Sequence, residues 1–149
     1  GTVAGIGRRL KEVNPAAKAF PLEPMSSPTL STGFKVGSHR IQGISDEFIP
    51  QIVKDNPLDN VVTVDDGDAI IMSRMLSEKL GIGVGVSAGA NFLGCILAQN
   101  MLGKDAVLTT VFADDNKKYL STDYSLPQEM KDDYLTKEIL LLGVKAHKN

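Results

Sequence analysis

A short strand that runs directly into a helix constrains the fold of this chain more than any other feature. Residues 82–86, Ile-Gly-Val-Gly-Val, predict a buried strand, and Ser87-Ala88-Gly89 leads straight into a helix predicted over residues 90–101. Such a turn places Ser87 at the carboxyl end of the strand, where small neighbours let a ligand approach the backbone. A plainer interpretation is that Ser87 only caps the helix. The residues alone leave both interpretations open.

Other apolar segments alternate between strand and helix patterns along the chain. Strands are predicted at residues 17–22, 61–64 and 108–112, with a brief extended piece at 41–44. Helices are predicted over residues 3–13, 48–53 and 131–142, and between the Asp65-Asp66-Gly67-Asp68 cluster and Gly81. This alternation predicts an α/β fold, a three-layer sandwich with a mainly parallel sheet, in which ligands bind beyond the carboxyl ends of the strands. The 149 residues suffice for one domain, which we expect to span residues 1–149.

Composition argues against several classes of function. The net charge is -2 and no basic stripe is present, so nucleic acid and anionic membranes are poor partners. No apolar run approaches the ~20 residues needed to span a bilayer, and no signal peptide is visible. The single cysteine, Cys95, excludes an internal disulfide, is expected to pack in the core, and suits a cytoplasmic location. The aspartates at 65–68 lack the closing glutamate of a calcium loop, so no metal site is expected.

The first two residues, Gly1 and Thr2, precede a helix whose free N–H groups could bind a phosphate. A glycine–threonine pair is also an ordinary helix start. Because the chain opens on this pair without a methionine, we expect the first residue to lie within a loop of a longer protein.

Four stretches together resemble one known family in order and approximate spacing. They are Gly1-Thr2 followed by GIGRRLKEVNP, HRIQGI and FIP at 39–50, GVSAGAN at 85–91, and TVFADDNKKYLST at 110–122. The chain is similar to the C-terminal half of the cysteine synthase (O-acetylserine sulfhydrylase) and cystathionine β-synthase family, the fold-type II pyridoxal-phosphate (PLP) enzymes. The resemblance covers nearly the whole chain.

The resemblance implies PLP as cofactor and assigns roles to four residues. Gly1 and Thr2 would be the last residues of the loop that holds the cofactor phosphate, and Ser87 would bond the pyridine nitrogen. Asp114 would lie near the same ring edge. A neutral hydroxyl leaves that nitrogen largely unprotonated, which makes the ring a weaker electron sink and favours β-elimination and β-replacement on O-acetylserine, cysteine or serine.

The resemblance also implies that two catalytic elements are missing from this chain. The Schiff-base lysine and the loop that grips the substrate carboxylate lie upstream in relatives, and no lysine here occupies an equivalent place. The chain alone is therefore expected to be inactive and to need the upstream half of the enzyme. The resemblance implies a homodimer. A rival interpretation is a non-catalytic half-domain that has lost the lysine.

The sequence departs from the family after Gly43-Ile44, where relatives that make cysteine carry small residues. Here Gly43 and Ser45 would bind substrate, and Asp46 and Glu47 follow directly. One interpretation is that Ser45 caps a helix whose start favours two carboxylates. In the other, Asp46 is a general base on water or a thiol and repels hydrosulfide. The enzyme would then convert cysteine to hydrogen sulfide and serine, or condense it with another thiol, rather than synthesise cysteine.

Overall fold

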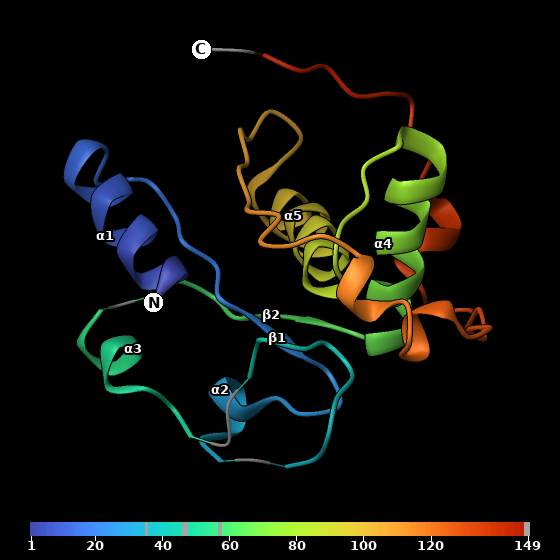
Figure 1. The fold of residues 1–149 in the computed structure, drawn as a ribbon. Helices are drawn as coiled ribbons and strands as arrows, with labels where there is room; N and C mark the ends of the chain where they lie inside the picture. The colour runs from blue at the N-terminus through green and yellow to red at the C-terminus, as the bar shows by residue number, and fades with distance from the viewer. Residues whose placement is uncertain (35, 46–47, 57, 148–149) are drawn as a thin grey trace.

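A small parallel sheet lies at the centre of the protein. The computed structural model describes residues 1–34, 36–45, 48–56 and 58–147. Strand β1 (Leu22–Pro24) pairs in parallel with β2 (Val62–Val64), with Leu22 opposite Val62 and Pro24 opposite Val64. Figure 1 shows the long helices α4 and α5 on one side of these strands and the short helices α2 and α3 on the other. The α/β architecture with a parallel sheet is therefore confirmed.

The helices follow the sequence prediction along most of the chain. Their bounds are Thr2–Val13 for α1, Thr29–Thr32 for α2, Gln51–Asp55 for α3, Asp66–Leu80 for α4 and Val86–Leu102 for α5. Three short 3-10 helices follow: η1 (Lys117–Tyr119), η2 (Asp123–Ser125) and η3 (Leu135–Glu138). Within the described residues, no helix is long and apolar enough to cross a membrane.

Helices α4 and α5 pack against each other to form most of the core. Their buried side chains include Ile70, Met72 and Leu93, which join Val64 of β2 in one apolar cluster. A Cβ placed on Gly89 of α5 would lie 2.6 Å from the backbone nitrogen of Ser73 and closer still to a backbone oxygen of α4. Glycine is therefore required where the two helix backbones meet.

The start and end of α4 are formed as the sequence predicts. Asp65 caps the helix and accepts a hydrogen bond from the backbone of Gly67 at 2.8 Å. Gly81 ends the helix in the left-handed conformation, at φ 69°.

The predicted helix over residues 131–142 is wrong. Its first half makes only the 3-10 turn η3, because Asp68 of α4 takes the backbone N–H groups of Leu135 and Thr136, at 2.9 and 3.2 Å. The Thr136 hydroxyl also donates to Asp68. Beyond η3 the chain is extended, with Leu140 and Leu142 80% and 90% exposed. Ile139 and Leu141 are half-buried against the core while Leu140 and Leu142 point outward, a two-residue period that does not form a helical face.

Three predicted strands are absent, shorter or displaced. Residues 108–112 pair with no strand among the described residues. They contact α5 instead, where the side chain of Asn91 donates to the backbone oxygen of Val111 at 2.9 Å. In the 82–86 segment only Val84 makes a bridge, to Asp115 and antiparallel. The strand predicted at 17–22 is replaced by β1 at residues 22–24, because only these residues lie beside β2.

Ser45 does not cap a helix. Helix α3 begins at Gln51, directly after Pro50, and no side chain caps it. Ser45 instead has a left-handed backbone, at φ 56°, and its hydroxyl donates to the backbone oxygen of Ser27 at 2.9 Å. Asp46 and Glu47, the predicted general base and its neighbour, lie outside the described residues.

The Gly89→Ala substitution is expected to lower the free energy of unfolding by about 1–3 kcal/mol or more, because a methyl group there collides with the α4 backbone. Gly5→Ala in α1 is the matched control. Nothing lies within 4 Å of the added Cβ at Gly5, so this change should stabilise by about 0.5–1 kcal/mol. Urea unfolding of the enzyme that carries this chain measures both. Equal effects at the two positions would contradict the close helix crossing.

Candidate functional site

Ser87 lies in the first turn of α5 with an unpartnered hydroxyl. Gly85, not Ser87, is the N-cap of α5, so Ser87 is not the cap of this helix. The residue is 9% exposed, and its hydroxyl makes no hydrogen bond with any described residue. Because the helix start is positively polarised, a hydroxyl there is available to a ligand with a lone pair.

Asp114 contacts Gly85, the residue that precedes α5. The backbone N–H of Gly85 donates to the Asp114 carbonyl at 3.0 Å. A Cβ on Gly85 would overlap Asp114 Oδ1 and lie 2.6 Å from the ring of Tyr119. The structure thus brings Asp114 to the start of the helix that carries Ser87, and a glycine at position 85 permits this approach.

The two oxygens of Asp114 have different surroundings. Oδ2 accepts from the Tyr119 hydroxyl at 2.7 Å and pairs with Lys118 Nζ. Oδ1 is buried and has no hydrogen-bond partner among the described residues. Burial alone would raise the pKa of this carboxyl, but the hydrogen bonds from Lys118 and Tyr119 outweigh it and hold the pKa below its usual value. Asp114 is therefore ionised at neutral pH, with its charge balanced by Lys118.

Gly1 and Thr2 begin α1 and are both exposed. No side chain caps this helix, and its first intrahelical bond runs from the N–H of Gly5 to the carbonyl of Gly1 at 2.9 Å. The N–H groups before Gly5 are consequently free of helix partners, as an anion site requires. Among described residues, no hydrogen bond connects Gly1 or Thr2 with Ser87 or Asp114.

Gly43 and Ser45 lie in a separate segment that follows β1 and contains α2, called here the 25–45 loop, in which residue 35 is outside the described residues. Both have left-handed backbones, at φ 87° and 56°. The Nε2 atom of His39 lies 3.3 Å from the Ser45 carbonyl oxygen, and the His39 Nδ1 atom is buried without a described partner. The loop therefore presents Gly43 and Ser45 in a defined shape just before the carboxylates at 46 and 47.

Sequence reasoning missed two carboxylates that shape this loop. Glu23 of β1 is fully buried and accepts from the N–H of Leu30 at 2.7 Å and from the hydroxyl of Ser31, and so fixes α2. Asp66 of α4 accepts from the backbone N–H of Arg40 at 2.8 Å. These partners lie 7 and 26 residues apart, and no local pattern indicates the longer of these pairings.

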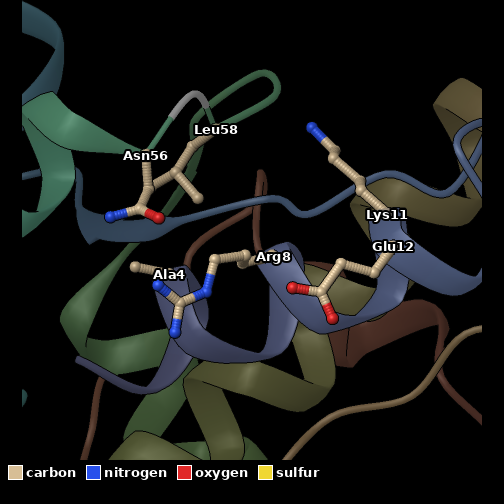
Figure 2. Close-up of a pocket in the computed structure, with 6 residues that line it drawn as sticks. All are labelled: Ala4, Arg8, Lys11, Glu12, Asn56 and Leu58. Atoms are coloured by element: carbon tan, nitrogen blue, oxygen red, sulfur yellow. The ribbon is translucent and has the colours of Figure 1, made fainter.

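One open pocket lies elsewhere, between α1 and residues 56–58 (Figure 2). It has a volume of about 320 Å³ and is lined by Ala4, Arg8, Lys11, Glu12, Asn56 and Leu58. None of the predicted site residues lines it. Lys11 is engaged with Asp59 at 2.8 Å. The pocket is thus separate from the site at the start of α5.

Comparison with known proteins identifies the family. The profile described as pyridoxal-phosphate dependent enzyme matches residues 1–114. This chain belongs to that family. Its curated relatives include cysteine synthase B of Campylobacter jejuni, 42% identical over 126 residues, which cover 83% of this chain and 40% of the relative. The chain therefore spans about two fifths of the length of such relatives.

Solved structures place the chain with fold-type II PLP enzymes. A hydrogen sulfide-producing enzyme from Fusobacterium nucleatum is 62% identical, with a TM-score of 0.87, over 92% of this chain and 41% of that one. A variant of that enzyme with an aspartate replaced by asparagine was solved with an α-aminoacrylate intermediate. It is 60% identical over 99% of this chain and 43% of its own, with a TM-score of 0.90. The recognition of the family and of its fold from the sequence is confirmed.

The residues present fit the cofactor of this PLP family. Ser87 offers a neutral, unpartnered hydroxyl suited to a pyridine nitrogen, and the first turn of α1 offers free N–H groups suited to a phosphate. The buried, unpartnered Oδ1 of Asp114 is a further polar atom with unmet bonding capacity.

Tyr119→Phe is expected to raise the pKa of Asp114 and to destabilise the protein by about 1–2 kcal/mol at neutral pH, because it removes a bond to an ionised oxygen. Because the pKa of Asp114 is lower in the folded protein than in the unfolded chain, its ionised form stabilises the fold at pH values above the unfolded pKa. The difference from the unmodified protein should therefore shrink as the pH falls below about 3.8. Denaturant unfolding across pH measures it.

Tyr124→Phe is the control for this prediction. The Tyr124 hydroxyl lies 3.3 Å from both Ser77 Oγ and Asn116 Nδ2, which are neutral groups, so its effect should not vary over the same pH range. Identical pH profiles for the two variants would contradict the assigned charge on Asp114.

Proposed function

We propose that this chain is the cofactor-binding C-terminal part of a PLP-dependent enzyme that performs β-elimination or β-replacement on cysteine, serine or O-acetylserine. The observation that carries the proposal is the neutral, unpartnered hydroxyl of Ser87 in the first turn of α5. Relatives named cysteine synthase and a neighbour named as hydrogen sulfide-producing support the reaction class.

The residues of this chain would hold the cofactor at two ends. Ser87 would bond the ring nitrogen, and the first turn of α1, with Gly1 and Thr2, would bind the phosphate. Bound PLP supplies an electron-withdrawing ring that stabilises negative charge at the substrate Cα. Asp114, paired with Lys118 and hydrogen-bonded to Tyr119, would border the ring without forcing a proton onto its nitrogen. A carboxylate without a cation or a hydrogen-bond donor beside it would favour protonation of the ring nitrogen.

We further propose that the enzyme releases hydrogen sulfide from cysteine. Gly43 and Ser45 would contact the substrate, and the Asp46 carboxylate would take a proton from water as the oxygen adds at Cβ. Cysteine and water then give serine and hydrogen sulfide, with atoms and charge in balance. The carboxylates at 46 and 47 would repel hydrosulfide and so favour water as the nucleophile that adds at Cβ. The 62% identity to a hydrogen sulfide-producing enzyme supports this direction over cysteine synthesis.

The remainder of the enzyme would supply the Schiff-base lysine and the grip on the substrate carboxylate. We expect the chain alone to be inactive, and the full enzyme to be a cytoplasmic homodimer. Absorbance separates this proposal from the rival of a non-catalytic half-domain. A full-length protein that is yellow with PLP and changes its spectrum with cysteine supports the enzyme, and a colourless, unresponsive one supports the rival.

In the full-length enzyme, Asp46→Asn is expected to lower the rate of serine and sulfide formation from cysteine by about 10²–10⁴-fold, because a general base is removed. Glu47→Gln is the matched control and should have a much smaller effect. Sulfide and serine are quantified together. A rate within about twofold of the unmodified enzyme for Asp46→Asn would exclude this residue as the base.

Ser87→Ala is expected to weaken PLP retention about tenfold, because one hydrogen bond to the ring is lost. Ser121→Ala, at an exposed serine, is the control. Equilibrium dialysis with absorbance of the released cofactor measures the effect without any turnover. Unchanged retention and an unchanged cofactor spectrum in Ser87→Ala would place the ring elsewhere.

A further inference from the structure

The 25–45 loop is bound to the start of α4 through a single buried carboxylate. Asp66 is 8% exposed. Its Oδ2 atom accepts the backbone N–H of Arg40 at 2.8 Å, and both oxygens lie 3.1 Å from the Ser26 hydroxyl. One carboxylate therefore holds the loop near both its ends, at positions 26 and 40.

The Arg40 side chain extends the same linkage to the C-terminal segment. Its Nη1 atom donates to Gln128 Oε1 at 2.8 Å and to Asp123 Oδ2 at 3.4 Å. Residues further along this segment are bound to α4, where Tyr134 and Lys131 donate to Asp65 at 2.6 and 3.0 Å. Arg40 thus joins the loop to a segment more than 80 residues away that is itself attached to the same helix start.

A second set of hydrogen bonds connects Ser27, next to Ser26, with Ser45. Ser27 is 1% exposed and donates to the Gly37 carbonyl at 3.2 Å. Its own carbonyl accepts the Ser45 hydroxyl at 2.9 Å. Ser45 is the one described non-glycine residue with a left-handed backbone, a conformation that surrounding contacts must hold in place.

We propose that Asp66 and Arg40 are positioning residues that set the shape of the 25–45 loop and so place Gly43 and Ser45 for the substrate. This rests on the proposed function, in which that loop contacts the amino-acid substrate. Arg40 is 41% exposed in its side chain, and a pair this exposed contributes little to overall stability. Its loss is therefore expected to change the loop and not the fold.

Kinetics of the full-length enzyme with cysteine provide the first test. Arg40→Gln is expected to raise KM about five- to tenfold with kcat within about twofold, because the loop is misplaced while the reacting groups remain. Ser26→Ala should act in the same direction. Arg9→Gln is the matched control, since Arg9 makes an exposed pair with Glu12 at 3.0 Å on α1, away from the loop.

Hydrogen exchange of the same enzyme provides a test that needs no turnover. Asp66→Asn is expected to speed exchange of the Arg40 amide about tenfold, because that N–H loses a charged acceptor. Arg40→Gln should speed exchange across residues 37–45 with a melting temperature like that of Arg9→Gln.

The two readouts separate the possible failures. An enzyme inactive on cysteine would refute the proposed release of hydrogen sulfide, and the exchange data would still decide the positioning role. Unchanged KM and unchanged loop exchange in Arg40→Gln and Ser26→Ala would overturn the proposal. So would a large loss of melting temperature with kcat and KM both changed, since that is the signature of a purely structural role.

Discussion

The arrangement of the whole chain depends on three carboxylates at the start of α4, one at its N-cap and two in its first turn. Asp65, Asp66 and Asp68 follow β2 directly, where the strand ends. Asp65 and Asp68 hold the C-terminal segment, and Asp66 holds the 25–45 loop. A helix N-terminus stabilises acidic groups, so this helix start can carry three of them and use them to hold two distant parts of the chain.

The proposed cofactor end of the site depends on small residues instead of charges. Gly85 allows Asp114 and the Tyr119 ring to lie against the backbone just before α5, and Gly89 allows α5 to cross α4 closely. Together they fix the direction of the helix that presents Ser87. A neutral hydroxyl at that point and a balanced carboxylate nearby are electrostatically suited to a ring whose nitrogen stays unprotonated.

Local patterns predicted local structure well, and contacts between distant residues account for most errors. The aspartates and the glycine at the two ends of α4 act on their own backbone, and these helix ends were predicted. The strand expected before Ser87 was not formed: only Val84 makes a bridge there, and α5 begins at Val86, so Ser87 lies within the helix. The helix expected over residues 131–142 was lost because Asp68, more than 60 residues earlier, takes its N–H groups. The sequence placed Asp114 near Ser87 only through family resemblance, and no spacing indicated that Asp66 would bind Arg40.

The extended segment after η3 has a consequence for handling the chain by itself. Leu140, Leu142 and Val144 alternate along it and are largely exposed, while Ile139 and Leu141 pack toward the core. The backbone of such a segment is a ready template for edge-to-edge pairing between molecules. A recombinant fragment ending here therefore carries an aggregation hazard, and charged substitutions at the outward-facing leucines would act as gatekeepers against fibril-like association.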